Sequence, residues 1–304
     1  MNSGEIKYDI YDQIYIDSAR RQGLTGKGVC VAILDTGIGP HQDFGWERGR
    51  IKAFYDSVNK KKYPYDDNSH GSHVAGIIGA SGLNPMGMPI GVAPDCEFVI
   101  LKVLDNRGNG RVPNVIEGLR WIRENQQKYK IRIVNISVGT PATGKDDEQS
   151  ELVKEVEKVW ESGMIVIVAA GNNGPGKKSI TVPGISRKVI TVGASDDEKF
   201  ARKDNGKIYY SGRGPTVSCI KKPDLVAPGA NIYSCGPFRD GYTLKSGTSM
   251  STPIVSGSVA LLLEKYPYLT NVQVKRMLWY ATDDLGMRWE RQGYGQLNLE
   301  KLLK

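Results

Sequence analysis

Three polar residues stand at the ends of apolar segments, where a fold could bring them together. Asp35 follows the apolar run 29–34, His70 opens a stretch of small residues, and Ser249 precedes a strongly apolar segment. A serine hydroxyl becomes an effective nucleophile when a neighbouring base accepts its proton and an acid fixes the tautomer of that base. Alone, Asp35 could cap a turn and Ser249 could cap a helix. Together, in the order Asp, His, Ser, they predict a site for nucleophilic acyl transfer.

A tight glycine turn carries an amide side chain that suits the same reaction. Residues 169–174 read Ala-Ala-Gly-Asn-Asn-Gly after an apolar run, so Asn172 stands where a strand is expected to end. The intermediate of acyl transfer needs directed hydrogen-bond donors for its oxyanion. We therefore predict that Asn172 and the backbone N–H of Ser249 are these donors. The positive end of the helix that Ser249 begins would add to the stabilisation.

A metal site is the alternative interpretation of the histidines. His70 and His73 are two of the three histidines in the chain. They are spaced i, i+3 and lack the glutamate of the H-E-x-x-H zinc motif. Zinc is therefore not expected, and the predicted chemistry requires no cofactor.

Strand-like and helix-like segments alternate along the chain and would position these residues. Nearly continuous apolar runs predict strands covered on both faces at residues 29–34, 98–104, 131–138 and 164–170. Helical patterns follow Pro113 and span residues 148–162 and 251–264, the last apolar nearly all round and so expected in the core. The alternation predicts an α/β fold, a doubly wound and mostly parallel sheet flanked by helices.

Charge and composition argue against several classes of partner. The chain of 304 residues has 41 Lys+Arg and 33 Asp+Glu, and its short basic runs are scattered. A nucleic-acid-binding protein more often has its basic residues clustered on one helix or strand. The sequence contains no apolar stretch of transmembrane length and no visible signal peptide. We expect neither nucleic acid nor a membrane as a partner.

The four cysteines form no C-x-x-C pair and no zinc-finger spacing. Cys30 lies within an apolar run, which predicts a buried free thiol. Cys219 and Cys235 flank a loop region and would pair only in an oxidising compartment, so their pairing stays open.

Four motifs in this order resemble those of the subtilisin family of serine peptidases, the subtilases. They are LDTGI around Asp35, HGSHVAG from His70, AAGNNGP around Asn172 and GTSMSTP around Ser249. The likeness extends over about residues 15–303. It implies a serine endopeptidase with Asp35, His70 and Ser249 as catalytic triad and Asn172 as oxyanion donor. The non-enzyme alternative, a catalytically silent subtilase-like scaffold for binding or signalling, would predict a damaged triad.

The amino-acid sequences of three further segments are similar to those of the bacterial AprX-like branch of the family. These segments are residues 64–76, 183–194 and 222–229. Members of this branch are often intracellular, so the resemblance implies a cytoplasmic location, with a secreted form as the alternative. It also implies one catalytic domain over residues 1–304, with residues 1–14 as an N-terminal extension.

The resemblance further implies how a protein or peptide substrate is held. Subtilases bind the substrate as an added β-strand, with side pockets for selectivity. The segments that would pair with this strand are Gly108-Asn109-Gly110 and Ser137-Val138-Gly139. The pocket for the residue before the cut would be lined by Ala169, Ala170 and Gly171. Such small residues leave room for large apolar or aromatic side chains.

Two further features of the family have uncertain counterparts in this chain. Many subtilases bind structural calcium through an acid after the catalytic Asp, and Asp43 is a possible Ca²⁺ ligand here. The partner loop, residues 83–87, has Pro85 where the family pattern offers an oxygen-bearing side chain. An inhibitory propeptide is a usual partner of subtilases, but no propeptide is visible before about Tyr15.

Overall fold

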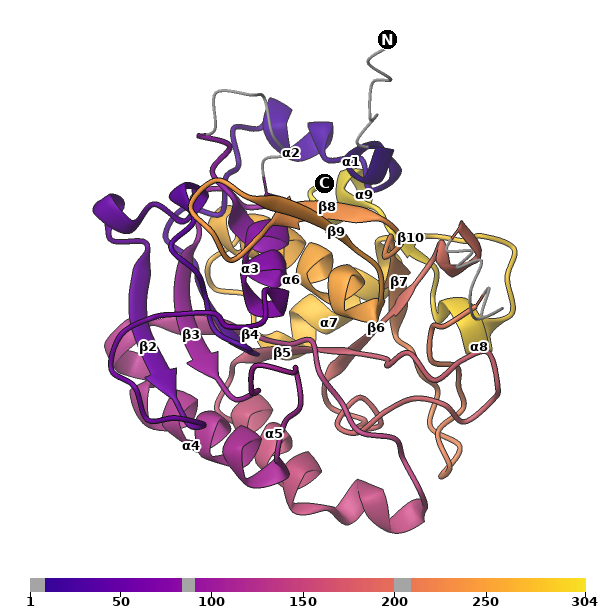
Figure 1. Cartoon of the computed structure of the whole chain (residues 1–304). Coiled ribbons are helices and arrows are strands. Elements are labelled where there is room, and N and C mark those ends of the chain that lie inside the picture. Colours follow the sequence, from indigo (N-terminus) through magenta and orange to yellow (C-terminus); the bar gives the residue numbers. More distant parts are fainter. Residues whose placement is uncertain (1–8, 84–90, 200–208) are drawn as a thin grey trace, which may run out of the picture.

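A central sheet forms the middle of the molecule (Figure 1), and Asp35 lies at the carboxyl end of one of its strands. In residues 9–83, 91–199 and 209–304, which the computed structural model describes, nine strands follow the order β10-β11-β7-β6-β5-β4-β1-β3-β2. They are β1 (Cys30–Asp35), β2 (Ile51–Asp56), β3 (Glu97–Lys102), β4 (Ile131–Ile136), β5 (Ile165–Ala169), β6 (Ile190–Ala194), β7 (Leu225–Ala227), β10 (Thr282–Asp283) and β11 (Gln296–Leu297). All neighbours pair in parallel except β10 and β11. The predicted parallel α/β sheet is confirmed.

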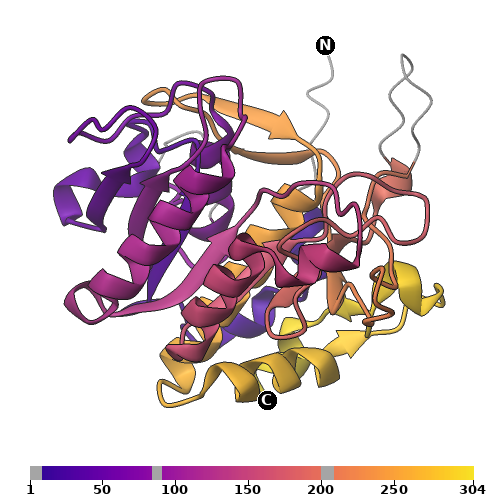
Figure 2. The same cartoon turned by 90° about the horizontal axis from the view of Figure 1, so that it is seen from below.

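Helices cover both faces of this sheet (Figure 2). They are α1 (Asp9–Gln13), α2 (Asp17–Arg21), α3 (His70–Gly79), α4 (Val112–Tyr129), α5 (Glu151–Glu161), α6 (Thr248–Lys265), α7 (Asn271–Tyr280), α8 (Trp289–Gln292) and α9 (Leu299–Leu302). The pair α4 and α5 covers one face, and α3 and α6 lie on the other. A separate antiparallel hairpin, β8 (Ile232–Cys235) and β9 (Tyr242–Lys245), lies against α3.

The central helix α6 is buried on nearly all sides, as its apolar sequence predicts. Several of its hydroxyl groups avoid a desolvation cost by bonding back to carbonyl oxygens one turn earlier. The Thr252 hydroxyl donates to Thr248 O at 2.8 Å, and the Ser258 hydroxyl donates to Ile254 O at 2.8 Å. The helix can therefore contain polar residues and still pack against strands β4, β5 and β6.

Two helix boundaries differ from the pattern, each for a local reason. The helix predicted over 148–162 begins at Glu151, because the Ser150 hydroxyl accepts the Val153 N–H at 3.4 Å and caps it there. The helix predicted from residue 251 begins at Thr248, after Gly247 with φ 147°. Ser249 therefore lies inside the first turn of α6.

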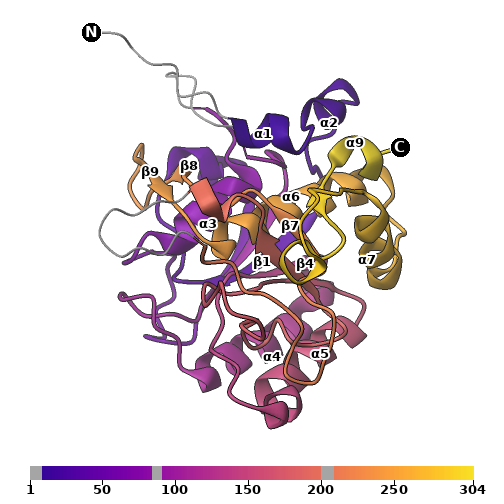
Figure 3. The same cartoon turned by 90° about the vertical axis from the view of Figure 1, so that its right-hand side faces the viewer.

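The described ends of the chain meet on one side of the molecule (Figure 3). Helix α9 packs against α2, and the Leu299 N–H donates to Ile14 O at 3.0 Å. Among the described residues, no helix is both long enough and apolar enough to span a membrane.

The structure has all four cysteines as free thiols. Cys30, Cys96 and Cys235 are buried and Cys219 is exposed. The buried free thiol predicted at Cys30 is confirmed. The sequence left open whether Cys219 and Cys235 form a disulfide, and in this structure they do not.

Candidate active site

Strand β1 and helix α3 bring Asp35 and His70 into direct contact. Asp35 ends β1 and is fully buried, and His70 is the first residue of α3. The His70 Nδ1 atom lies 2.7 Å from Asp35 Oδ1, which also accepts the Thr36 N–H at 2.7 Å. Burial lowers the pKa of His70, but the Asp35 charge and hydrogen bond outweigh burial and raise the pKa above its ordinary value. Because 24% of the His70 side chain stays exposed, the ring can still meet a substrate.

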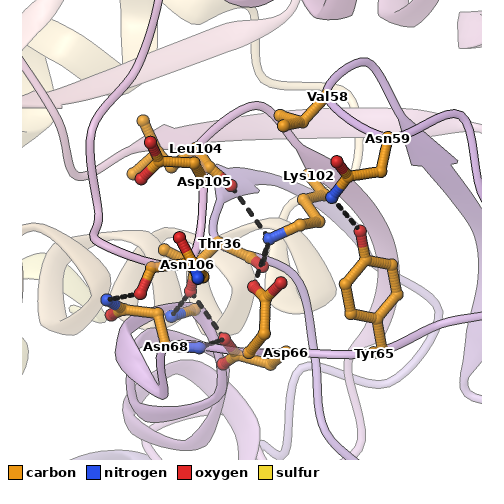
Figure 4. Close-up of polar contacts among 12 residues, drawn as sticks. Thr36, Val58, Asn59, Tyr65, Asp66, Asn68, Lys102, Leu104, Asp105 and Asn106 are labelled. Carbon is orange, nitrogen blue, oxygen red and sulfur yellow. Dashed lines mark hydrogen bonds and ion pairs between the residues drawn. The ribbon is translucent and has the colours of Figure 1, made fainter.

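A half-buried carboxylate, Asp66, organises the start of α3 (Figure 4). Its Oδ1 accepts the Thr36 hydroxyl at 2.8 Å, and its Oδ2 accepts the Ser72 N–H at 2.9 Å and the Ser72 hydroxyl at 2.6 Å. The N–H groups of Asn68 and Ser69 also donate to Oδ1, at 3.0 and 2.9 Å. Burial would raise the pKa of Asp66, but these donors outweigh it and lower the pKa. Asp66 is therefore a fixed negative charge behind His70.

A buried ammonium group holds the main chain that follows Asp35. Lys102 ends β3, is paired in register with Asp35 and is fully buried. Its Nζ donates to Thr36 O at 2.7 Å and to Leu104 O at 2.9 Å, and it pairs with Asp67 Oδ1 at 2.6 Å (Figure 4). The loop after β1 is thus tied to the loop after β3 and to the segment before α3.

Helix α6 presents Ser249 to the same region. The Ser249 hydroxyl donates a hydrogen bond to Ser137 O at 2.8 Å. Its acceptor in this arrangement is therefore the carbonyl that follows β4, and not His70. His70 and Ser249 nevertheless line one cavity of about 440 Å³. No hydrogen bond joins these two side chains in the described structure.

The amide of Asn172 is oriented by the start of α6. Its Oδ1 accepts the Thr248 N–H at 3.0 Å and the Thr248 hydroxyl at 3.1 Å. A backbone N–H can only donate, so the oxygen of the amide must face Thr248. This leaves the NH₂ group as a donor for the cavity that Asn172 and Ser249 share.

Most residues predicted to bind substrate line this cavity or its neighbour. Gly108, Ser137, Val138, Gly139, Ala169 and Gly171 line the first cavity. Asn109 and Gly110 line an adjoining cavity of about 250 Å³, with apolar walls that include Val115 and Leu152. Ala170 is fully buried and lines neither of these two cavities.

Sequence reasoning missed several residues around the first cavity, including Asn68, Arg107 and Pro141. Asn68 lies two residues before His70, and that proximity was the only signal for it. Arg107 lies in the loop before Gly108, and loops after parallel strands often line sites.

Among the described residues, those around Asp43 do not resemble a calcium site. Its Oδ1 accepts the Leu83 N–H at 3.0 Å and its Oδ2 accepts the Tyr242 hydroxyl at 2.6 Å. The nearby groups able to hold a metal are His41 and Cys235, with ligand atoms of all three within 4.8 Å. Calcium takes oxygen ligands, whereas nitrogen and sulfur donors suit other metals. Residues 84–87 of the predicted loop lie outside the described residues.

Comparisons with known proteins agree with this geometry. The subtilase family model matches residues 26–296. The chain is 42% identical over 302 residues to Serine protease AprX of Bacillus subtilis (strain 168), covering 92% of this chain and 67% of that protein. It is 35% identical over 288 residues to Subtilisin Savinase of Lederbergia lenta, covering 95% of each. The crystal structure of a cold adapted subtilisin-like serine proteinase aligns with a TM-score of 0.72 at 30% identity, covering 90% of each chain.

Proposed function

Because the chain belongs to the subtilase family and is a subtilisin-like serine protease, we propose that it is an endopeptidase that forms an acyl-enzyme on Ser249. In this proposal His70 is the general base and Asp35 orients it. Asn172 and the Ser249 N–H donate to the oxyanion. The observation that carries the proposal is the 2.7 Å contact between Asp35 and His70 beside the cavity that Ser249 and Asn172 line.

The reaction begins when the Ser249 hydroxyl leaves Ser137 O and turns toward His70. The Nε2 atom of His70 takes the proton as Oγ attacks the substrate carbonyl carbon, and the Asp35 carboxylate stabilises the imidazolium. His70 then gives this proton to the leaving amine, and the peptide C–N bond breaks. A water molecule, activated by His70, cleaves the acyl-enzyme and restores the hydroxyl of Ser249.

We propose that the substrate binds as an extended strand between residues 108–110 and residues 137–139. Ala169 and Gly171 would face the side chain before the cut. Gly139 and Gly171 both lie against Thr181: an added Cβ would come within 2.5 and 2.3 Å of its side chain. Close packing against Thr181 therefore requires glycine at both positions. The proposed preference for a large apolar residue before the cut is supported by the small residues Ala169 and Gly171 in the cavity lining.

The test compares the wild type with Ser249→Ala and with Ser246→Ala as a matched control. Each is treated with a phosphonate that carries a phenylalanine-like side chain, and then with an unfolded protein whose fragments are sequenced by mass spectrometry. Wild type and Ser246→Ala should be labelled and should cleave after large apolar residues, and Ser249→Ala should do neither. A folded wild type that neither labels nor cleaves would leave the silent scaffold as the function. Cleavage mainly after Lys or Arg would overturn the proposed preference.

Three accessory features remain proposals. A structural Ca²⁺ with Asp43 as its carboxylate ligand stays a prediction, which the His41 and Cys235 donors beside Asp43 do not favour. Loss of thermal stability on adding a chelator, absent in Asp43→Asn, would support it. An inhibitory propeptide is a proposed partner, testable by adding a family propeptide in trans. A cytoplasmic location is supported by the four free thiols, which a reducing compartment preserves; cell fractionation would test it.

A further inference from the structure

A cavity of about 290 Å³ shares no lining residue with the candidate active site. It lies between residues 220–224, helix α7 and residues 289–294. Its volume is at the lower end of the roughly 300–1,000 Å³ of small-molecule pockets, and so suits a ligand of about one amino acid. Nothing in the proposed mechanism uses this cavity.

The floor of the cavity holds two ammonium groups that share one carboxylate. Asp224 is buried, and its Oδ2 lies 2.7 Å from Lys222 Nζ while its Oδ1 lies 3.4 Å from Lys275 Nζ. The same carboxylate also accepts the Thr191 N–H at 2.8 Å and the Trp279 Nε1–H at 3.0 Å. Asp224 is the only acid among the residues that line the cavity. One positive charge on the floor is therefore without a balancing carboxylate.

This excess charge is costly to bury. Lys275 Nζ is held by three carbonyl oxygens, of Arg187, Lys188 and Val189, at 2.8, 3.0 and 2.8 Å. Burial first, and then the charge of Lys222, lower the pKa of Lys275 to about 7 although Asp224 opposes them. A buried charge is stabilised when a counter-ion comes close. An anion in the cavity would supply that counter-charge.

Two further cations line the cavity and are available to a ligand. Arg187 and Lys221 are both exposed, and no carboxylate of the described residues forms an ion pair with either. Lys221 Nζ instead lies 5.5 Å from the centroid of the Trp289 ring. An arginine guanidinium offers two parallel N–H donors, which match the two oxygens of a carboxylate.

Flat aromatic faces form the rest of the wall. Trp279 and Tyr294 are stacked with ring centroids 5.0 Å apart and planes at 15°. Trp289 is 37% exposed and Tyr294 is 50% exposed, so both have free surface beside the cavity. Such rings bind another planar apolar group by stacking or by edge-to-face contact.

We propose that this cavity binds a singly charged carboxylate attached to an aromatic ring, with Arg187 and Lys221 on the carboxylate and Trp279, Trp289 and Tyr294 on the ring. The planar fork of Arg187, with Lys221 beside it, matches the two oxygens of one carboxylate. The ligand could be a free aromatic amino acid derivative or the last residue of a peptide chain, since both present this chemistry. The proposal does not depend on the proposed catalytic roles.

The experiment is a calorimetric titration of the Ser249→Ala protein with N-acetyl-phenylalanine. Its neutral amide, N-acetyl-phenylalaninamide, should bind at least about tenfold more weakly, because charge-assisted hydrogen bonds are lost. N-acetyl-alanine should also bind more weakly, because it lacks the ring. Equal binding of the acid and the amide, or no saturable binding of the acid, would overturn the proposal.

A double variant assigns the binding to this cavity. Arg187→Gln with Lys221→Gln should weaken binding of the acid by about tenfold or more. The matched control, Arg111→Gln with Lys128→Gln, removes the same charge from exposed positions of α4 and its N-terminal flank and should leave affinity unchanged. If the first pair has no effect, the acid binds elsewhere, for example in the active-site cavity, and the proposal is wrong.

Two further titrations define the ligand. The first uses a tetrapeptide that ends in phenylalanine. If the tetrapeptide binds as tightly as N-acetyl-phenylalanine, the ligand is the end of a peptide chain. If the tetrapeptide does not bind, the ligand is a free amino acid derivative, and either result supports the carboxylate site. Phenyl phosphate tests the charge. Tighter binding of this dianion than of the carboxylate would overturn the assignment of a singly charged ligand.

Discussion

The Thr36 hydroxyl accepts the Gly71 N–H at 2.8 Å and so joins the two residues that directly follow Asp35 and His70. The same hydroxyl donates to Asp66, which also holds the first turn of α3. The spacing between the proposed base and its acid is thus set by a buried polar network. Removing one member of such a network is costly because its partners are left unpaired.

Asp66 should therefore act as a positioning residue for His70. Asp66→Asn replaces an acceptor oxygen by a donor NH₂ group, so part of the network cannot form. We expect kcat to fall about 10- to 100-fold with a smaller change in KM, because a small misplacement of a catalytic group is enough for such a loss. The loss of a negative charge that raises the pKa of His70 should also move the acid limb of kcat/KM to lower pH.

The control for this variant is Asp284→Asn. Asp284 is an exposed acid that accepts the Gly286 N–H at 2.9 Å and a proton of Gln292 Nε2 at 2.7 Å, and it belongs to neither proposed site. If the role of Asp66 is purely structural, Asp66→Asn should lower the stability of the protein without shifting the acid limb of kcat/KM. That outcome would contradict the positioning role.

The pH dependence of activity should report the raised pKa of His70. The base works only when neutral, so kcat/KM should rise with pH through a midpoint above the ordinary histidine value of 6.5. The Asp35 carboxylate is the first cause of the increase, so Asp35→Asn should lower the midpoint and reduce kcat by several orders of magnitude. A wild-type midpoint below 6.5 would contradict the electrostatic account of the pair.

Asn172 should affect the rate and not the binding of substrate. Asn172→Ala removes one oxyanion donor, and we expect kcat to fall about 10²- to 10³-fold, the loss already known for such a donor in subtilisin. KM should change little, because the interaction strengthens only in the transition state. Steady-state kinetics on a peptide substrate measures both, with Asn114→Ala on α4 as the control. A large increase in KM with kcat unchanged would assign Asn172 to ground-state binding.

Lys275 should make the stability of the protein depend on pH. Its pKa is about 7 in the folded chain and 10.5 in its ordinary state, so between these values the unfolded chain binds more protons. Stability should therefore rise as pH rises from 7, by at most about 1.4 kcal/mol per pH unit for one proton. Lys222 and Asp224 are the charged groups that face Lys275, and the lowered pKa of Lys222 acts in the same direction.

Urea unfolding of the Ser249→Ala protein between about pH 7 and 8.5 would measure this slope. The buried cysteines, whose pKa values are raised by burial, lower the slope by the same amount in every variant compared. Lys275→Met in the same background should flatten it, since one of the two titrating ammonium groups is gone. The comparison uses the difference in slope, because the lost carbonyl contacts change absolute stability. An unchanged slope would show that Lys275 keeps its proton at neutral pH.

The sequence could predict those parts of the site that depend on local patterns. The apolar run before Asp35 and the small-residue segment after His70 each form their element, since strand and helix periodicity are local. Asp66 was not predicted as an organising residue, because its segment has the composition of a solvated loop. Lys102 follows an apolar run, and a lysine at such a position is expected to be an exposed strand end. It is fully buried, because three loops supply oxygen atoms to its ammonium group.

The cavity beside α7 was also beyond prediction. Its residues come from segments near 187, 221, 275 and 290, and no periodicity connects them. The packing of α7 against β5 and of α8 against β6 brings these segments together. Pairs of lysines in a sequence usually indicate a solvated surface. Here Lys221 is exposed, but its neighbour Lys222 is 1% exposed.

The order of strands in the sheet bears on when a newly made chain can become active. β1, made first among the strands, lies inside the sheet, with β4 on one side and β3 on the other, and β5, β6 and β7 follow outward from β4 in chain order. Helix α6, which carries Ser249, packs on β4, β5 and β6, so it can dock only after those strands are in place. Asp35 and His70 leave the ribosome long before Ser249. Under the proposed mechanism, a growing chain therefore cannot cleave its neighbours until Ser249 is in place, late in folding.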